Sequence, residues 1–370
     1  MFALYGNNGV VPPIQSAAGI LADAGWEVRV YGIRPQGGSK TIRVTERPSL
    51  TARDMSSCPP GWRQKLHFLI FCLWVVVTTF VWRPRWVYLS DPFTTGVGYV
   101  LCRLGVHVVY HEHDGPAAGP VPLHLRLRGA LARRANLCVL PAAGRVTAFV
   151  AATGRTGPTL CVNNCPRLVE VPPPGPPAGD RPLTLIYSGS IGEDRIPEAV
   201  VRAVAAIPGT RFVAVGYEAQ EPERYIPRLK QLAAELGASD QVEFLPGRTR
   251  AAVWPLLTAA DVGLSVRPLS VADPNFVHMV GATNKAFDYF AAGLPLLVSE
   301  LPEWMEAYVN EGLALACRPD DAGSVAAALR RFTSDRQLTR RMGEAGRQRV
   351  LVEWNYETQF EPVKRFLEGL

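Results

Sequence analysis

The stretch NKAFDYFAAGLPLLVSE, residues 284–300, contains the unit from which most of the chain is built. Its aromatic residues supply apolar bulk for a helix, and Gly293 with Pro295 ends that helix before the strand LPLLVS. Asn284 is a residue type that caps helices, so we expect it to cap this one. A helix, a tight turn and a buried strand together predict one repeat of an α/β fold.

Charged residues at the head of this stretch suggest a second role. The first amides of a helix have no partner within the helix, and Lys285 lies beside them, so the helix start can hold an anion. Asp288 follows one turn later and can accept hydrogen bonds from hydroxyl groups. A nucleoside diphosphate has both kinds of group, an anionic diphosphate and hydroxyls that can donate hydrogen bonds. The alternative is an amphipathic helix whose Lys285 and Asp288 simply face water.

The same alternation of strands and helices runs through both halves of the chain. It begins with FALYG, IQSAAGILADAG and EVRVYGI, stops at a Pro-rich stretch, and restarts with LTLIYSGS. Helices between buried strands require right-handed crossovers and a parallel sheet. The sequence therefore predicts an α/β protein with two Rossmann-like, doubly wound domains facing a central cleft. The expected parts are an N-terminal domain 1–167, a linker 168–182, a C-terminal domain 183–352, and a helix 353–370 that crosses back to the N-terminal domain.

Length and composition agree with two folded domains. The chain has 370 residues, of which 48% are apolar and 19% charged, so each half can bury a core. The formal net charge is +6, but the basic residues are spread along the chain, which argues against nucleic acid as a partner. This balance suits phosphorylated small molecules and an anionic membrane surface equally well.

The seven cysteines are an odd number, and their close pair, CVNNC, has no further metal ligands beside it. We therefore expect reduced thiols in a cytoplasmic protein. No signal peptide is expected, since the chain begins with a short strand. The segment Leu66–Trp82 is long and apolar and is flanked by basic residues. We expect a buried helix there first, a helix on a membrane surface second, and a membrane span last.

The order of these motifs resembles that of the retaining family-4 glycosyltransferases, which have the GT-B fold. The resemblance rests on NKAFDYFAAGLP, preceded at the usual spacing by VEFLPG and AADVGLSV. It implies an enzyme that moves a sugar from a nucleoside-diphosphate sugar, with GDP or UDP as the nucleotide, with retention and without a metal. The sugar nucleotide is then a substrate, and no cofactor is expected.

The resemblance implies a set of donor-binding residues in the second half of the chain. Asp288 stands where the family has a carboxylate that holds the ribose hydroxyls, and Arg248 lies where the loop main chain contacts the base. In YSGSIGEDR the family's Arg after Gly189 is Ser190, whereas its later Lys is Arg195, which can still pair with phosphate. The expected diphosphate cradle consists of the amides of Gly281, Ala282, Thr283 and Asn284, together with Lys285.

One position departs from the family pattern. The family commonly has a second carboxylate eight residues before the ribose-binding one, where it contacts the donor sugar, and this chain has Val280 there. His278 or Asp273 is near enough in sequence to substitute. The other explanation is a deoxygenated or otherwise unusual donor sugar, as in natural-product pathways.

In the first half, the turn GNNGV and the strand end YHEHDGP provide the polar candidates. The resemblance places Gly9 near the donor phosphate, and it places a His that contacts the donor sugar and organises the acceptor at the strand end. We favour His113 for that role. His111 and His113 share a strand face and could instead hold a metal, but the resemblance argues against a metal site. The acceptor-side candidates are Asn7, Asn8, His111, His113 and Asp114.

The expected reaction is departure of the nucleotide diphosphate with attack by the acceptor from the same face. His113, Arg195 and Lys285 are the expected catalytic residues. The expected acceptor is a small molecule, with a lipid or polysaccharide precursor at a membrane surface as the alternative. Two other functions remain open, namely a GT-B sugar-nucleotide epimerase and a noncatalytic subunit that binds sugar nucleotides. The expected location is the cytoplasm or the membrane surface, and the sequence does not give the oligomeric state.

Overall fold

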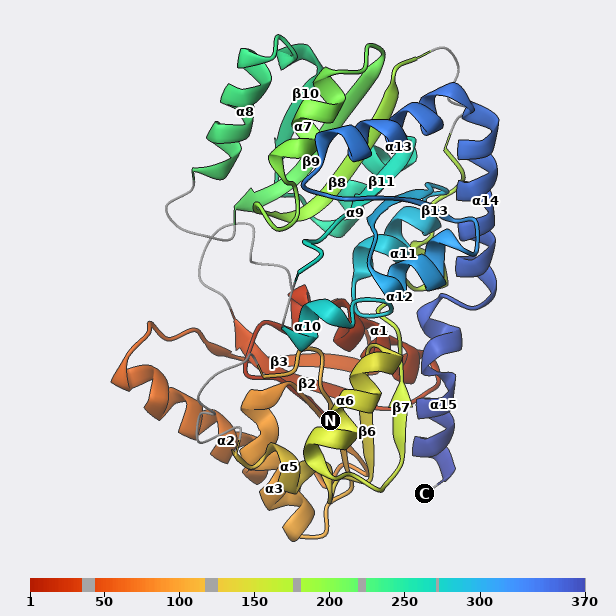
Figure 1. Cartoon of the computed structure of the whole chain (residues 1–370). Helices are drawn as coiled ribbons and strands as arrows, with labels where there is room; N and C mark the ends of the chain where they lie inside the picture. Colours follow the sequence, from red (N-terminus) through yellow and green to blue (C-terminus); the bar gives the residue numbers. More distant parts are fainter. Residues whose placement is uncertain (35–43, 117–125, 176–180, 219–223, 271–272, 370) are drawn as a thin grey trace. The chain divides into compact units, whose positions relative to one another are not determined.

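The computed structural model describes residues 1–34, 44–116, 126–175, 181–218, 224–270 and 273–369 (Figure 1). The chain divides into two compact units, and each is described here by itself. Unit 1 comprises Met1–Arg167, Asp273–Ala282 and Tyr356–Leu370, and unit 2 comprises Leu168–Ala272 and Thr283–Asn355. The segment Asp273–Ala282, which the sequence placed within domain 183–352, therefore belongs to unit 1. Residues 176–180 of the expected linker lie outside the described residues.

Unit 1 is built on a seven-stranded sheet with the strand order β3-β2-β1-β4-β5-β6-β7, and all of its strand pairs are parallel. The order reverses between β1 and β4, and in open parallel sheets ligands bind beyond the carboxyl ends of the strands at such a reversal. The strands are β1 (Phe2–Ala3), β2 (Val28–Arg34), β3 (Leu50–Ser56), β4 (Val87–Ser90), β5 (Val108–His111), β6 (Leu137–Leu140) and β7 (Thr159–Cys161).

Helices cover both faces of this sheet because successive side chains of each strand point to opposite faces. Phe2 and Val30 pack against α1 and α15, whereas Ala3 and Tyr31 pack against α2, α3, α5 and α6. The helices of unit 1 are α1 (Pro12–Asp23), α2 (Trp62–Trp82), α3 (Thr95–Arg103), α5 (Arg128–Ala132), α6 (Ala143–Thr153), α10 (Pro274–Val277) and α15 (Tyr356–Gly369). The C-terminal helix is fixed to unit 1, since Trp86 Nε1 donates to the Leu367 carbonyl at 3.0 Å.

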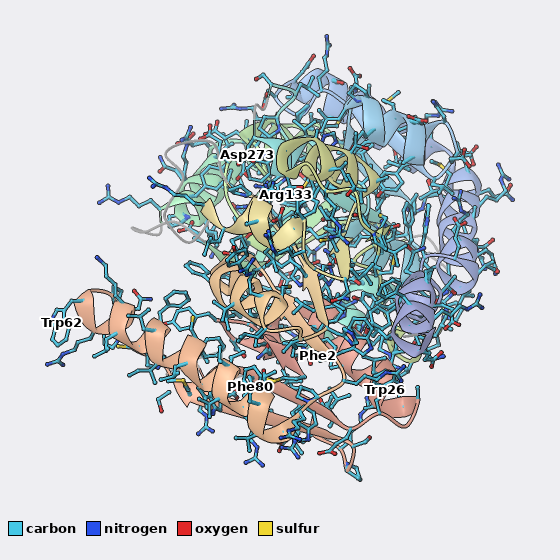
Figure 2. The ribbon with its side chains drawn as sticks, turned by 90° about the horizontal axis from the view of Figure 1, so that it is seen from below. Phe2, Trp26, Trp62, Phe80, Arg133 and Asp273 are labelled. Carbon is cyan, nitrogen blue, oxygen red and sulfur yellow. The ribbon has the colours of Figure 1, made fainter. Side chains whose placement is uncertain are left out.

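Helix α2 is not the buried helix that the sequence led us to expect first. Its buried residues are Phe71, Val75 and Thr79, which lie four apart and form one narrow stripe along the helix. The rest of its surface is partly or fully exposed, as at Trp62 and Phe80 in Figure 2. Within the described residues, α2 is the one helix whose length and composition would allow it to cross a membrane.

Unit 2 contains a six-stranded sheet with the order β10-β9-β8-β11-β12-β13, again parallel throughout. Its order reverses between β8 and β11, which marks the expected ligand edge. The strands are β8 (Leu183–Ile191), β9 (Thr210–Glu218), β10 (Val242–Pro246), β11 (Val262–Ser265), β12 (Leu296–Ser299) and β13 (Ala314–Cys317).

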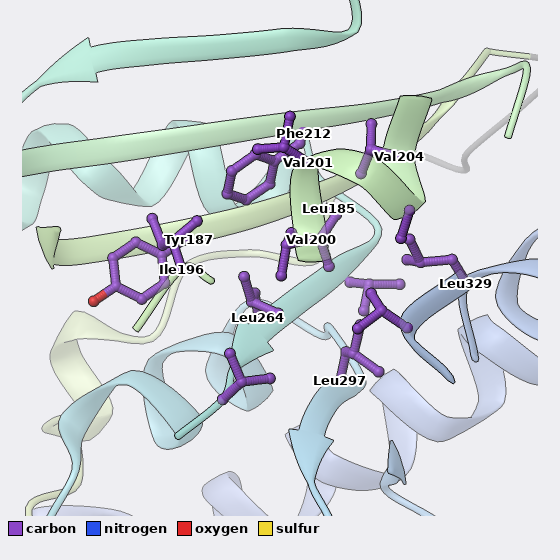
Figure 3. Packing of buried hydrophobic residues seen from close by; sticks show 14 of the residues in the cluster. Leu185, Tyr187, Ile196, Val200, Val201, Val204, Phe212, Leu264, Leu297 and Leu329 are labelled. Carbon is purple, nitrogen blue, oxygen red and sulfur yellow. The ribbon is translucent and has the colours of Figure 1, made fainter. Parts of the chain in front are cut away.

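The core of unit 2 lies between the strands and helices α7, α8 and α13, where Leu185, Val200, Phe212 and Leu329 belong to one buried cluster (Figure 3). The principal helices are α7 (Glu198–Ala205), α8 (Tyr225–Glu235), α9 (Arg250–Thr258), α11 (Asn284–Ala291), α12 (Pro302–Trp304), α13 (Ala322–Ser334) and α14 (Arg336–Val352). This core holds β8 and β11 side by side, so the residues at their carboxyl ends have fixed positions.

Candidate active site

The carboxyl end of β8 is shaped by glycine. Gly189 has a φ of +131°, and a Cβ added to it would lie 2.6 Å from Cε of Lys285. The neighbouring Gly216 also has no room for a side chain, since its Cβ would lie 1.8 Å from the Gly189 carbonyl oxygen. Glycine therefore allows the Lys285 side chain to lie directly against the backbone here. Ser190, the next residue, accepts a hydrogen bond from the Tyr187 hydroxyl through its carbonyl at 2.6 Å.

Three cationic side chains gather at the reversal between β8 and β11. Arg195 lies in the turn after β8, Lys285 lies against Gly189, and Arg267 follows β11. Burial, together with the charges of Arg267 and Arg195, lowers the pKa of Lys285 to about 8. Burial also lowers the pKa of Arg267, again with a contribution from Arg195. Arg195 thus raises the cost of charging both Arg267 and Lys285, and a bound anion would offset that cost.

One carboxylate lies among these cations. Asp194 forms an ion pair with Nη1 of Arg267 and lies 3.5 Å from Nη1 of Arg195. The sequence analysis identified Arg195 and Lys285 but missed Arg267 and Asp194. A signal for Arg267 was present, since it directly follows the buried strand segment DVGLSV. Polar residues at the carboxyl ends of parallel strands are candidates for ligand binding.

Helix α11 begins one residue earlier than expected. Thr283, not Asn284, occupies the N-cap position, with extended backbone angles, and its side chain makes no capping hydrogen bond. The first amides of the helix are therefore without a side-chain cap, as an anion site requires. The helix is fixed to the sheet by Tyr289, whose hydroxyl accepts from the Ser188 amide at 2.9 Å. Gly263 makes room for the Tyr289 ring, since a Cβ there would lie 2.3 Å from Cδ2.

The four residues of the expected amide cradle are divided between the two units. Thr283 and Asn284 belong to unit 2, whereas Gly281 and Ala282 belong to unit 1. The Ala282 amide already donates to the Met279 carbonyl at 3.1 Å. Gly281 has a φ of +90°, and a Cβ added to it would lie 2.2 Å from Nδ2 of Asn163, so packing within unit 1 requires a glycine here.

Asp288 does not stand alone as a hydroxyl acceptor. Its Oδ1 lies 2.5 Å from Nη2 of Arg250, the first residue of α9, and Arg250 also lies 3.4 Å from Glu170. Burial raises the pKa of Asp288 to about 6, while Arg250 opposes the shift and Glu170 adds to it. The second oxygen of a carboxylate can still accept a hydrogen bond. Arg250 was missed because it is 38 residues away in sequence.

The remaining candidate residues of the second half lie outside the group of cations around Lys285. Arg248 is exposed in the loop after β10. Val280 is partly buried in the segment assigned to unit 1. Asp273, one expected substitute for the missing carboxylate, accepts a hydrogen bond from the Asn275 amide at 2.9 Å. The carbonyl of His278, the other substitute, accepts a hydrogen bond from Arg145.

In unit 1, the turn GNNGV is held by its own side chains. Asn7 accepts a hydrogen bond from the Gly9 amide at 2.9 Å, and Nδ2 of Asn8 donates to the Tyr31 carbonyl at 3.0 Å. The Gly9 carbonyl accepts from Gln15 at 2.8 Å. Asn7 and Asn8 therefore shape the turn after β1.

A buried polar cluster follows strands β4 and β5. His111 Nδ1 lies 2.8 Å from the Tyr88 hydroxyl, and the rings of His111 and His113 are 3.9 Å apart between centroids. Among the described residues, neither ring nitrogen of His113 has a hydrogen-bond partner. Burial lowers the pKa values of both histidines, so both rings are neutral near pH 7. A buried ring without partners is available to a ligand, which favours His113 over His111.

Asp91 is the residue of this cluster that sequence analysis missed. Its Oδ1 accepts the His113 amide at 3.0 Å, and its backbone has a φ of +66°. Burial raises the pKa of Asp91, with His113 opposing the shift. Asp91 directly follows the buried strand YLS, which was the available signal.

Arg145 joins two distant parts of unit 1. Its guanidinium donates to the carbonyls of His113, Asn275 and His278, and it pairs with the exposed Asp114 at 3.0 Å. Asn275 adds two hydrogen bonds to the backbone of Gly115. The buried Arg145 thus fixes the segment Asp273–Ala282 beside the end of β5.

Other features of the described residues lie away from this chemistry. A cavity of about 260 Å³ is lined by Met1, Phe2, Val28 and Trp86, at the amino ends of strands, which is not the ligand edge of a parallel sheet. No group of three or more His, Cys, Asp or Glu that could hold a metal is found among the residues described. The seven cysteines form no disulfide; three are buried and four partly exposed.

Comparison with known proteins finds similarity to glycosyltransferases over part of the chain. The family model described as "Glycosyl transferase-like" matches residues 195–365. The lipopolysaccharide core biosynthesis glycosyltransferase LpsD of Rhizobium meliloti is 32% identical over 152 residues, which are 40% of this chain and 38% of that protein. A D-inositol 3-phosphate glycosyltransferase of Nocardia farcinica is 29% identical over 163 residues, 42% of this chain and 34% of that protein. The matched segments thus span less than two fifths of these relatives.

Solved structures match over the whole chain. The HepE protein of Anabaena in complex with UDP-glucose has a TM-score of 0.74 at 17% identity, covering 100% of this chain and 99% of that one. WaaG, a glycosyltransferase of lipopolysaccharide biosynthesis, has a TM-score of 0.68 at 16% identity, covering 99% of this chain and 98% of that one. At these identities the likeness establishes the fold, which confirms the expected GT-B architecture of two Rossmann-like units.

Proposed function

We propose that this chain, which has the GT-B fold and resembles the family-4 glycosyltransferases, transfers a sugar from a nucleoside-diphosphate sugar to an acceptor. The anomeric configuration is retained, and no metal takes part. The observation that carries this proposal is the convergence of Arg195, Arg267 and Lys285 beside the uncapped start of α11. These groups suit a diphosphate, because it is the part of the donor that carries charge.

In the proposed reaction, the bond between the anomeric carbon and the diphosphate oxygen breaks, and its electron pair leaves with the diphosphate. Arg195, Arg267 and Lys285 stabilise that developing charge, and no reorganisation is needed because they already lie together. The acceptor oxygen attacks the same face of the sugar. Its proton passes to the departing phosphate, so the reaction requires no separate general base.

The proposed role of His113 is to hydrogen-bond a hydroxyl of the bound sugar or acceptor. Its neutral ring offers one donor and one acceptor nitrogen, and both lack partners among the described residues. Asp91 fixes its backbone through the amide, and Arg145 does so through the carbonyl. His113 is therefore held in place while its ring remains available.

Asp288 and Val280 bear on which sugar nucleotide is the donor, because Asp288 is the proposed partner of the ribose and Val280 stands where the family contacts the sugar. Asp288 is proposed to accept the ribose hydroxyls through the oxygen that Arg250 does not bind. UDP is the first nucleotide to test, since the similar HepE structure contains UDP-glucose. Val280 favours an unusual sugar, and Val280→Glu is expected to improve the use of an ordinary hexose donor. Efficient use of UDP-glucose by the native protein would count against the unusual-sugar proposal.

The experiment is incubation of the native chain and Arg195→Ala with UDP- and GDP-sugars and a set of small-molecule and lipid-linked acceptors. Free nucleotide together with a glycosylated acceptor identifies a transferase, whereas an altered sugar nucleotide identifies an epimerase. Loss of one charge-stabilising donor is expected to lower turnover by about 10²–10³-fold. Arg340→Ala, at an exposed position, is the matched control and should leave turnover unchanged. Turnover by Arg195→Ala at the native level would refute the phosphate assignment.

A further inference from the structure

Helix α2 presents an apolar face to solvent along its whole length. We define the apolar face of α2 by six residues whose exposed fractions run from 47% at Phe80 to 70% at Trp62. They are Trp62, Leu66, Leu69, Leu73, Val77 and Phe80. Monomeric soluble proteins rarely expose a contiguous apolar patch of this kind unless it binds something.

The spacing of these residues places them on one side of the helix, opposite the side that packs on unit 1. They recur at steps of three and four, as helical neighbours do, and the buried stripe of Phe71, Val75 and Thr79 lies on the other side. A surface helix of a soluble domain is normally polar on its outer face. Helix α2 is apolar on both.

Charge distinguishes between the partners that could cover this face. The helix Trp62–Trp82 contains no Asp or Glu, and exposed basic residues stand at both ends, Arg63 and Lys65 at the first and Arg83 and Arg85 beyond the last. A tryptophan also begins and ends the helix. Basic residues and tryptophan around an apolar face are characteristic of helices that lie in the headgroup region of an anionic bilayer.

The packing of α2 within unit 1 determines how it would meet a bilayer. Trp74 contacts Tyr31 with ring centroids 4.8 Å apart, and Phe71 contacts Tyr5 at 5.3 Å. Crossing the membrane would pull these side chains and Val75 away from the sheet core. At 1.5 Å per residue the helix is about 31 Å long, so it can lie along the surface over that length.

We infer that the apolar face of α2 docks unit 1 on the surface of a bilayer of anionic phospholipid, with the helix lying in the plane of that surface. The apolar side chains enter the boundary of headgroups and acyl chains, and the flanking basic residues pair with lipid phosphates.

Docking also orients the ligand edge of unit 1. Tyr5 lies between β1 and the GNNGV turn, and its hydroxyl is 3.0 Å from Nδ1 of His67 in the first part of α2. The carboxyl ends of the unit 1 strands are therefore on the side of Trp62. A membrane-borne acceptor would reach that edge from the bilayer. This last consequence rests on the proposed glycosyl transfer, whereas docking itself does not.

The test is sedimentation of the full chain with vesicles of phosphatidylcholine alone or mixed equally with phosphatidylglycerol. We expect binding to the mixed vesicles that weakens with salt, and a loss of at least about tenfold in partition for the double variant Leu69→Glu/Leu73→Glu. The matched control is Val169→Glu/Leu236→Glu, which changes exposed apolar residues of unit 2 and should bind as the native chain does. Because all four positions are exposed, unfolding curves should show both variants folded.

Each other outcome would overturn the inference. Equal loss in both double variants would show that the effect is not specific to α2. Native binding by Leu69→Glu/Leu73→Glu would show that the apolar face is not used. Self-association without vesicle binding would identify a second copy of the chain as the occupant. Retention in vesicles after alkaline carbonate washing would indicate a span and not a helix in the surface plane. None of these readouts uses catalytic turnover, so failure of docking and failure of the proposed function are distinguishable.

Discussion

Nucleotide binding is expected to draw a proton onto Lys285. In the free protein, burial and the nearby Arg267 and Arg195 lower the pKa of Lys285 from 10.5 to about 8. A bound diphosphate supplies the missing negative charge, which favours the charged amine and raises this pKa again. The experiment therefore adds UDP to the protein. The matched variant is Lys285→Arg, which keeps the positive charge but does not titrate between pH 8 and pH 10.5.

The size of the effect follows from the two pKa values. At pH 9 a group with a pKa of about 8 is about one tenth protonated, and a group returned to about 10.5 is almost fully protonated, so uptake is about 0.9 proton per UDP. At pH 7 the free protein is already charged, and uptake by Lys285 falls to about 0.1 proton. Because the bound state holds more protons, affinity must fall as pH rises from about 8 to 10.5.

Isothermal titration calorimetry in buffers of different ionisation enthalpy measures this uptake directly. At pH 9 the diphosphate of UDP is fully ionised, and its partly ionised uracil ring is common to the titrations of the native protein and of Lys285→Arg, so the difference between the two belongs to Lys285. Lys285→Arg should bind UDP at pH 9 and take up about 0.9 proton less than the native protein. The reasoning is refuted if native binding at pH 9 takes up no proton, or if Lys285→Arg takes up the same amount.

Three further substitutions test residues that hold the candidate ligand-binding residues in place. Arg145→Ala leaves one buried and two partly buried carbonyls without their donor and should lower the free energy of unfolding by about 3–5 kcal/mol in urea titrations. Gly189→Ala puts a Cβ against Lys285 at a φ of +131°, and should cost about 1–3 kcal/mol of stability and weaken UDP binding in calorimetry. Arg250→Leu removes the cation that opposes the raised pKa of Asp288, so the acid limb of UDP binding, near pH 6 in the native protein, should move to higher pH.

For each of these three predictions, one result would contradict the reasoning. An Arg145→Ala variant as stable as the exposed control Arg340→Ala would show that the carbonyls have other donors. Unchanged UDP binding by Gly189→Ala would show that Lys285 need not lie against this turn. An acid limb unmoved by Arg250→Leu would show that Asp288 does not control binding at low pH.

The sequence by itself determined the features that depend on local order. The period of apolar residues predicted alternating strands and helices, and hence two parallel-sheet units, because that period reflects which faces are buried. Short motifs located Gly189, Lys285 and His113 at strand ends or a helix start. The same local information failed at Asn284, since Thr283 instead occupies the N-cap position of α11.

Tertiary structure alone decided which distant groups meet. The pairs Arg267 with Asp194 and Arg250 with Asp288 are separated by 73 and 38 residues, and Arg145 holds Asn275 across 130 residues. The apolar pattern of α2 was readable, but the side that stays exposed depends on how narrow a stripe the sheet of unit 1 covers. A sequence records which side chains tend to be buried. Their partners, charges and pKa values arise only when packing brings separate segments into contact.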